Sequence, residues 1–201
     1  MKILIVGASG TIGSAVADRL KHSHTLITAG FSHGDLQCDL SDLDSLHSLF
    51  EHTGDLDAII CAAGLSSFGP FEHLTQADYQ QTLDNKLMGQ VNLVRLGRRY
   101  LRPGGSITLT SGFVSQNPVP GSACVAMANG ALESFARAVA LELPQLRVNV
   151  VCPSFVEETL AMMGMSNEDA FSADQTAEVY LAALNGTMTG QTLRVAELIA
   201  A

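Results

Sequence analysis

A glycine-rich segment near the start of the chain has the spacing of a phosphate-binding turn. It reads Gly7-Ala8-Ser9-Gly10-Thr11-Ile12-Gly13 and follows the apolar run Ile3 to Val6. Glycines let the backbone turn tightly and approach a pyrophosphate, while the start of the following helix offers free N–H groups. The position between a strand and a helix makes this signal specific. The segment predicts a dinucleotide site, whose binding residues are Gly7, Ser9, Gly10, Thr11, Ile12 and Gly13.

The end of the second apolar run bears on which dinucleotide binds. In sites of this kind, an acidic residue about twenty positions further on holds the ribose hydroxyls of NAD. Residues 29–33 read Ala-Gly-Phe-Ser-His instead. No carboxylate stands there to repel a 2′-phosphate, and no Arg or Lys stands there to bind one. Both NAD and NADP stay open; we favour NADP, with Phe31 and Ser32 beside the ribose.

Asp39 and Leu40 follow a short third apolar run and form the next candidate part of this site. Asp39 is placed to reach the adenine. An equally good interpretation is that Asp39 shares with Ser41 the capping of the helix that follows. The residues alone do not decide between the two roles.

The thiols and imidazoles do not indicate a metal or disulfide protein. The cysteines, at positions 38, 61, 124 and 152, are widely spaced and form no C-x-x-C pair, and all six histidines precede residue 74 without metal-site spacing. Buried free thiols of this kind are typical of reduced proteins. We therefore expect a cytoplasmic protein without a metal site.

Composition excludes several classes of partner. The chain has 201 residues, 47% of them hydrophobic, with 20 acidic and 11 basic residues and a net charge of -9. This charge disfavours nucleic acid, because a phosphate backbone would be repelled. No apolar run approaches the roughly 20 residues that span a bilayer. The expected partner is a small-molecule substrate.

The elements that must position these residues alternate regularly along the chain. Strands are expected at 3–6, 25–29, within 35–40, 56–61, 106–110, 147–152 and 192–195, and helices over 12–20, after a Ser41 cap, from a Thr75-x-x-Asp78 capping box to about 100, over 121–143 and over 173–185. Alternating strands and helices predict βαβ units. The expected fold is α/β: one Rossmann-type domain over residues 1–201, with a doubly wound, mostly parallel sheet of seven strands and helices on both faces.

Taken together, these motifs resemble the short-chain dehydrogenase/reductase family over nearly the whole chain. The resemblance rests on the glycine turn, Cys61-Ala62-Ala63-Gly64, Asn85, Thr108-Leu109-Thr110-Ser111-Gly112, residues 147–154 (RVNVVCPS) and Thr189-Gly190-Gln191. It implies hydride transfer between a nicotinamide and a carbonyl or alcohol. It also implies that Ser111 binds the substrate oxygen and Asn85 holds a water in a proton relay. By the same resemblance, Ala62, Ala63 and Gly64 line the ribose, and the stretch from Pro153 to Val156 meets the carboxamide.

The chain departs from the family pattern at the general acid. The family has a Tyr followed four residues later by a Lys, about thirteen residues after the serine, and this sequence contains no such pair. One register puts Cys124 and Ala128 there, and another puts Val125 and Asn129 there. Cys124 is either the replacement acid or, as we favour, a packed thiol. Lys86 is expected to point outward, about 100° from Asn85 on a regular helix.

Two functions from different classes follow. One is an NAD(P)(H)-dependent oxidoreductase of short-chain type with a reduced catalytic set; the other is a sensor or scaffold that binds the dinucleotide without chemistry. Residues 154–172 are expected to be a loop, either a substrate cover or an ordinary connection. The two long helices match the elements through which the family associates, so a homodimer or homotetramer is expected.

Overall fold

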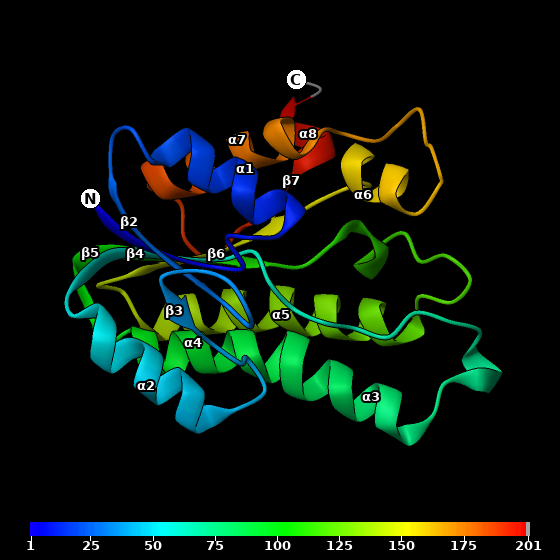
Figure 1. Cartoon of the computed structure of the whole chain (residues 1–201), viewed down its shortest axis with the longest axis horizontal. Helices are drawn as coiled ribbons and strands as arrows, with labels where there is room; N and C mark the ends of the chain where they lie inside the picture. The colour runs from blue at the N-terminus through cyan, green and yellow to red at the C-terminus, as the bar shows by residue number, and fades with distance from the viewer. Residues whose placement is uncertain (200–201) are drawn as a thin grey trace.

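The computed structural model describes residues 1–199 and contains one parallel sheet, in the strand order β3-β2-β1-β4-β5-β6-β7 (Figure 1). The strands are β1 (Lys2–Val6), β2 (Thr25–Gly30), β3 (Leu36–Gln37), β4 (Leu56–Cys61), β5 (Leu101–Thr110), β6 (Arg147–Cys152) and β7 (Thr192–Arg194). Every strand pairing is parallel. The order runs outward in both directions from β1, and this confirms the predicted doubly wound α/β fold.

Helices cover both faces of the sheet. They are α1 (Thr11–Leu20), α2 (Leu43–Thr53), α3 (Gln76–Thr82), a π-helix η2 (Leu83–Met88), α4 (Gly89–Gly97), α5 (Ala123–Glu142), α6 (Glu157–Met162), α7 (Ala173–Asn185) and α8 (Val195–Ile199), with short 3₁₀ turns η1 (Phe71–His73) and η3 (Phe113–Ser115). In Figure 1, α1, α7 and α8 lie above the sheet, whereas α2 to α5 lie below it.

Side chains alternate between the two faces of each strand, and this alternation divides the core into two layers. In β1, Ile3 and Ile5 face the α1 and α7 side, while Leu4 and Val6 face the α2, α4 and α5 side. Successive side chains of a strand point to opposite faces, so a sheet covered on both sides needs continuous apolar strands. The sheet is thereby held rigid between two apolar layers, and the loops at its carboxyl edge have a fixed base.

Three predicted element boundaries were wrong. Asp42, not Ser41, caps α2, because its side chain accepts the N–H of Asp44 at 2.9 Å. Strand β5 begins at Leu101, five residues earlier than predicted, with a register irregularity against β4. The stretch expected as a loop contains helix α6.

The predicted long helix after Thr75 is present but not regular. It begins with the predicted capping box, in which the Thr75 side chain and the Asp78 side chain each accept the other's backbone N–H. Six residues of π-helix, Leu83–Met88, then separate α3 from α4. A π-turn widens the helix and changes the direction of the side chains within it. This irregularity decides where Lys86 points.

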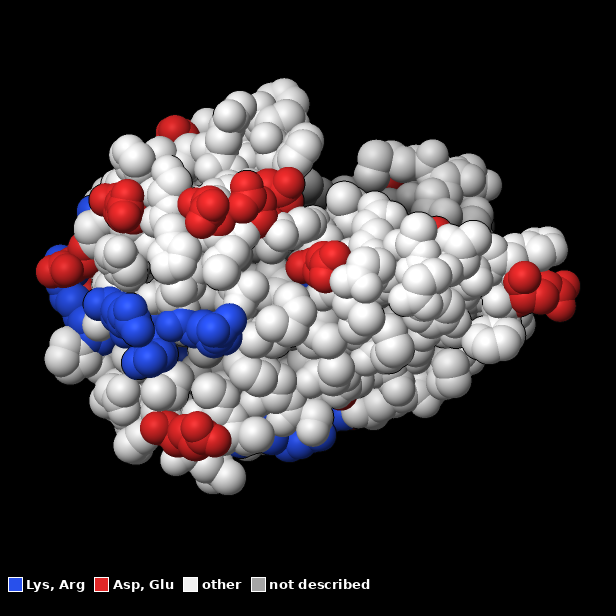
Figure 2. Space-filling view, turned by 90° about the horizontal axis from the view of Figure 1, so that it is seen from below, with Lys and Arg blue, Asp and Glu red and all other residues white. Residues whose placement is uncertain are grey.

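None of the helices within residues 1–199 is long and apolar enough to cross a membrane. Seen from the helical layer below the sheet, most of the visible Lys and Arg side chains gather near one end of the face, bordered by acidic side chains, and a few more lie at the lower edge (Figure 2).

Candidate functional site

A cleft of about 510 Å³ opens at the carboxyl ends of β1, β2 and β4. It brings together ten of the predicted site residues, which are Gly7, Ser9, Gly10, Phe31, Asp39, Leu40, Ala62, Ala63, Gly64 and Asn85. Ligands of doubly wound sheets bind in the crevice outside the carboxyl ends of the strands. The cleft therefore lies where the fold is expected to bind a ligand.

The glycine turn is built for close approach of the backbone to a ligand. Gly7 has a φ of +88°, and a Cβ on Gly13 would lie 2.0 Å from the carbonyl oxygen of Gly7. Helix α1 begins immediately afterwards at Thr11, with Gly10 as its cap and no acidic residue in its first turn. Its free N–H groups and the positive end of its dipole favour an anion. These residues fit a pyrophosphate.

The other wall of the cleft is held together by Asn85. The Nδ2 of Asn85 donates to the hydroxyl of Ser41 at 2.8 Å, and its Oδ1 accepts the N–H of Leu65 at 2.7 Å. These bonds tie η2 both to the loop after β3 and to the loop after β4. The geometry thus gives Asn85 a position in the wall of the binding cleft. The proton-relay role stays a prediction.

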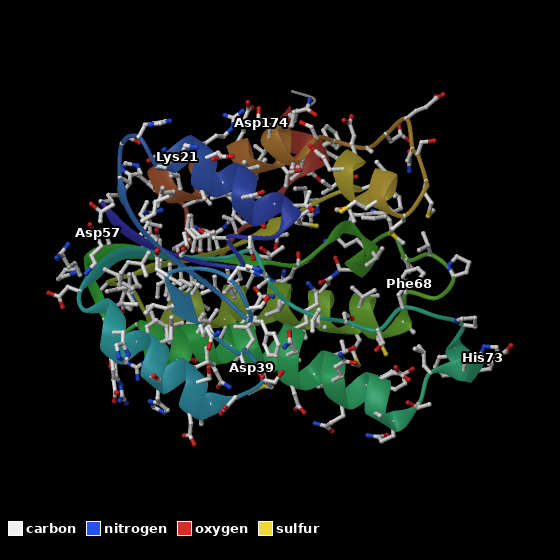
Figure 3. The ribbon with its side chains drawn as sticks, viewed as in Figure 1. Lys21, Asp39, Asp57, Phe68, His73 and Asp174 are labelled. Atoms are coloured by element: carbon white, nitrogen blue, oxygen red, sulfur yellow. The ribbon has the colours of Figure 1, made fainter. Side chains whose placement is uncertain are left out.

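Asp39 lies in the loop between β3 and α2 (Figure 3) and lines the cleft. Its carboxylate accepts the N–H of Ser41 at 2.8 Å and does not cap α2. Of the two roles left open, the helix cap is therefore wrong, while contact with an adenine stays a prediction.

The remaining predicted cofactor residues do not line the cleft. Ile12 is half-buried, with its side chain packed against the core. Ser32 is exposed and bonds to His33. The carbonyl of Pro153 accepts the N–H of Phe113 at 2.9 Å, and Val156 is buried in a bridge with Phe171.

Ser111 follows β5 and is buried against a carboxylate that the sequence did not indicate. Its hydroxyl donates to Glu133 at 3.0 Å, and Ser115 and Gln116 donate to the same carboxylate at 2.7 and 3.3 Å. Glu133 is itself buried in α5. A polar residue four positions after Asn129, on the same face of an alanine-rich helix, was the available signal.

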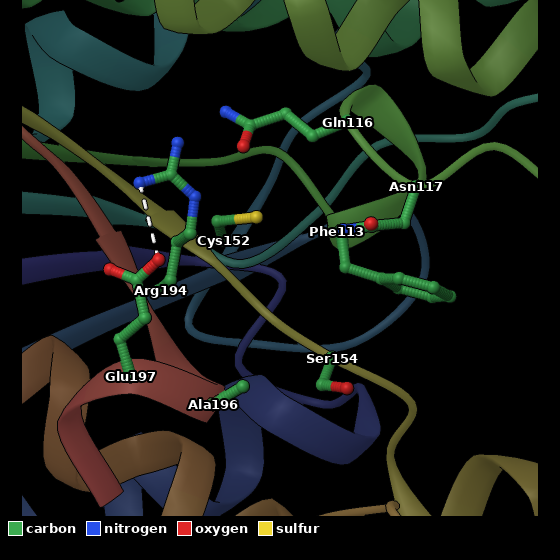
Figure 4. Close-up of a pocket in the computed structure, with 8 residues that line it drawn as sticks. All are labelled: Phe113, Gln116, Asn117, Cys152, Ser154, Arg194, Ala196 and Glu197. Atoms are coloured by element: carbon green, nitrogen blue, oxygen red, sulfur yellow. Dashed lines mark ion pairs between the residues drawn. The ribbon is translucent and has the colours of Figure 1, made fainter. Parts of the chain in front are cut away.

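Cys152, at the end of β6, lies beside Ser111. Burial raises the pKa of the Cys152 thiol to about 11, although the Ser111 hydroxyl hydrogen-bonds to it and opposes the shift. At neutral pH this thiol is protonated and unreactive. Cys152 also lines a small pocket of about 130 Å³ on the β7 side, together with Gln116 and the ion pair between Arg194 and Glu197 at 3.8 Å (Figure 4).

The structure distinguishes the two registers for the missing acid. Cys124 is fully buried and lies against the Thr82 hydroxyl of α3; burial raises the pKa of its thiol. Asn129 instead faces the Ser111 loop, because its Nδ2 donates to the carbonyl of Gly112 at 3.3 Å. Among the described residues, none makes a hydrogen bond to the buried Oδ1 of Asn129. That atom is therefore an unpaired acceptor buried within the described part of the protein.

The prediction that Lys86 points outward was wrong. Lys86 is only 8% exposed, since the π-helix turns its side chain toward the sheet. The sequence predicts a regular helix here, because no residue type indicates a π-turn.

Comparison with known proteins identifies the lineage of this arrangement. A family model described as enoyl-(acyl carrier protein) reductase matches residues 7–199. The chain belongs to the short-chain dehydrogenase/reductase family. This family binds NAD or NADP, and its members are oxidoreductases.

Solved and curated relatives resemble the chain over most of its length. The protein lin1944 from Listeria innocua is 39% identical, with a TM-score of 0.93 over 97% of this chain and 99% of that one. A small-chain dehydrogenase in complex with NADPH is 28% identical, with a TM-score of 0.88 over 100% and 99%. Versicolorin reductase of Emericella nidulans is 26% identical over 90% of this chain and 81% of its own.

Proposed function

We propose that this short-chain family member is an NADP(H)-dependent reductase of a small carbonyl compound. The observation that carries the proposal is the glycine turn opening into the cleft of about 510 Å³. The bound nicotinamide supplies or accepts the hydride. The turn, with Thr11 and the backbone of Ile12, binds the pyrophosphate, and Asn129 accepts a ribose hydroxyl.

NADP is preferred to NAD on the character of residues 30–33. The mostly exposed Phe31 lines the cleft beside Ser32, and no carboxylate stands among these four residues to repel a 2′-phosphate. A relative that is 28% identical was solved with NADPH. Calorimetric titration with NADPH and NADH tests the preference, and tighter binding of NADH would contradict it.

Ser111 holds the substrate oxygen in this proposal, with its hydroxyl hydrogen turned from Glu133 to that oxygen. The test is NADPH oxidation with a panel of aldehydes, ketones and quinones, repeated with Ser111→Ala. We expect turnover with at least one substrate and a loss of about tenfold or more in kcat/KM for the variant, because a hydrogen bond to developing charge is removed. Unchanged turnover in the variant would assign the chemistry elsewhere.

A second candidate is a dinucleotide-binding sensor or scaffold. The observation that favours it is that Asn129 occupies the side of α5 facing the Ser111 loop, and α5 contains neither a tyrosine nor a lysine. It predicts NADPH binding without oxidation by any member of the panel. Turnover of a single substrate excludes it.

We also propose that the chain associates with copies of itself through its two long helical segments. Three large apolar side chains on them, Met88, Met127 and Leu141, are 40%, 41% and 85% exposed. Light scattering after gel filtration tests this, and a monomer at micromolar concentration would contradict it.

A further inference from the structure

Lys86 is a buried cation without a partner. It is 8% exposed, and none of residues 1–199 offers its Nζ a hydrogen bond or an ion pair. The other two lysines are both engaged: Lys2 donates to the carbonyl of Thr53 at 2.6 Å, and Lys21 pairs with Asp18 at 2.7 Å. Its Nζ is not among the fully buried unpaired side-chain atoms of the described residues, so the ammonium group keeps some contact with solvent. A mostly buried charge without a protein partner is still costly and calls for an explanation.

The side chain of Lys86 runs toward the catalytic edge of the sheet. It passes Gly64 so closely that a Cβ on that glycine would lie 3.1 Å from Lys86 Cγ. Gly64 follows the end of β4, and the neighbouring strand β5 leads directly into Ser111. Lys86 therefore lies at the carboxyl edge of the sheet, next to the strand that leads into Ser111.

A buried glutamine fixes Lys86 relative to that serine. The Nε2 of Gln90 donates to the carbonyls of Lys86 and Thr110 at 3.2 and 2.9 Å, and its Oε1 accepts the N–H of Thr110 at 2.8 Å. Thr110 is the residue before Ser111. The π-helix thus turns Lys86 inward, and Gln90 clamps its backbone to the end of β5. π-Turns occur frequently at functional sites.

The surroundings of Lys86 suit proton transfer near neutral pH. Burial lowers the pKa of Lys86 to about 8, and the thiols of Cys61 and Cys152 oppose the shift. Two charged groups act on the Cys152 thiol: Glu133 from α5 raises its pKa and Arg194 from β7 lowers it. The buried Tyr180 from α7 interacts with both thiols. An acid is most effective when its pKa lies near the working pH.

We propose that Lys86 is the proton donor of the reduction, in place of the tyrosine that the sequence lacks. The inference rests on the proposed function. In the step, the carbonyl carbon of the substrate gains a hydride from the reduced nicotinamide, which is thereby oxidised. The C=O double bond becomes a single bond, and its oxygen takes a proton from the Lys86 ammonium. The resulting amine regains its proton from water.

Other buried acids are worse placed for this step. Cys124 lies against Thr82 of α3. Tyr180 is fully buried on the opposite face of the sheet and bonds to the Thr110 hydroxyl. Glu133 accepts three hydrogen bonds and so acts as an acceptor in this geometry.

The first test reads Lys86 directly and needs no substrate. The chain has three lysines, so [ε-¹³C]lysine labelling gives three signals, which Lys2→Arg and Lys21→Arg variants assign. We expect the Lys86 signal to titrate near pH 8 in the free protein, and to shift on addition of saturating NADP⁺. A Lys86 signal that does not respond to bound NADP⁺ would overturn the proposal.

The second test separates binding from proton donation, with Lys21→Met as the matched control. We expect Lys86→Met to bind NADPH within about threefold of the wild type while losing about 100-fold or more in kcat/KM for the best substrate of the panel, as for the loss of a general acid. The alkaline limb of the pH profile of kcat/KM, centred near 8 in the wild type, should disappear with it. Wild-type kcat/KM in Lys86→Met would overturn the role of Lys86 alone. Failure of the wild type to bind NADPH would instead overturn the proposed function, and this inference with it.

Discussion

The cleft beside β1 and the edge beside β5 lie on the same sheet, yet they use different parts of the chain. The cleft is built from a glycine turn, a helix start and the small residues Ala62 and Ala63. The edge brings together side chains from separate elements: Ser111 after β5, Glu133 and Asn129 from α5, and Lys86 from η2.

This difference explains why the cleft keeps the glycine pattern of the short-chain family, whereas the edge beside β5 lacks the family's Tyr and Lys. A backbone site depends on the spacing of glycines and admits few alternatives. A side-chain site requires only that a suitable group reach the reacting atom, whichever helix carries that group. The comparison predicts that changes in the cleft act mainly on affinity and that changes at the edge act on stability and rate.

The largest effect is expected for Gly13→Ala. The new Cβ would lie 2.0 Å from the carbonyl oxygen of Gly7, so the turn or α1 must move. We expect NADPH affinity to fall about 100-fold or more, or roughly 3 kcal/mol, measured by calorimetry. The control is Gly130→Ala in α5, where no atom lies within 4 Å of the new Cβ. Binding by Gly13→Ala within threefold of the control would show that the turn does not carry the pyrophosphate.

The second largest effect is expected on the free energy of unfolding of Lys86→Met, a substitution that removes a mostly buried charge. The pKa of Lys86 falls from 10.5 to about 8 on folding. The folded state therefore binds the proton less well than the unfolded state, and below pH 8 the charge destabilises the fold. At pH 7 the variant should unfold at a higher urea concentration than the wild type. Its free energy of unfolding should be greater by up to roughly 3 kcal/mol.

The gain should shrink as the pH rises from 8 to 10.5, since the wild type gains stability where only the unfolded chain keeps the proton. Both proteins contain the same cysteines. Subtracting the wild-type free energy of unfolding from that of the variant at each pH therefore removes the contribution of thiol titration. A variant less stable than the wild type at pH 7 contradicts an unpaired Lys86.

Glu133→Gln tests the carboxylate that organises Ser111. The amide keeps the shape but loses the charge, and its NH₂ group opposes one of the donors that now bind the carboxylate. We expect a loss of about 1–3 kcal/mol in the free energy of unfolding and a decrease in kcat. Glu142→Gln, at the exposed end of the same helix, is the control and should change neither.

The smallest effect is expected for Asn85→Ala, and it separates two roles. Loss of the bonds to Ser41 and Leu65 should weaken NADPH binding about tenfold, or roughly 1.4 kcal/mol, with kcat unchanged. The control is Asn92→Ala, whose side chain bonds within residues 1–199 only to Arg95. A decrease in kcat with unchanged affinity would instead support the predicted role of Asn85 in a proton relay.

The cleft was largely predictable from the sequence. Ten of its lining residues are predicted by the sequence. Glycine spacing and short apolar strands depend on neighbours along the chain, and parallel strands end at a common edge. The two layers of the core follow as well, since apolar runs such as Ile3 to Val6 must be covered on both faces.

The edge beside β5 was not predictable in the same way. Ser111 was identified by its motif, but Glu133 is visible only when α5 packs beside β5. Lys86 was assigned to the outside because the sequence predicts a regular helix, and the π-turn between α3 and α4 reverses that orientation.

The amino-acid sequence by itself determined the order of strands and helices, the phosphate turn and the absence of a Tyr-x-x-x-Lys pair. Only the tertiary structure decided which of Cys124 and Asn129 faces Ser111 and where the Lys86 charge lies. The physical reason is range: turns and periodicity depend on neighbours in the chain, whereas the direction of a side chain across a helix–sheet contact depends on residues such as Gln90 and Thr110, which are twenty positions apart.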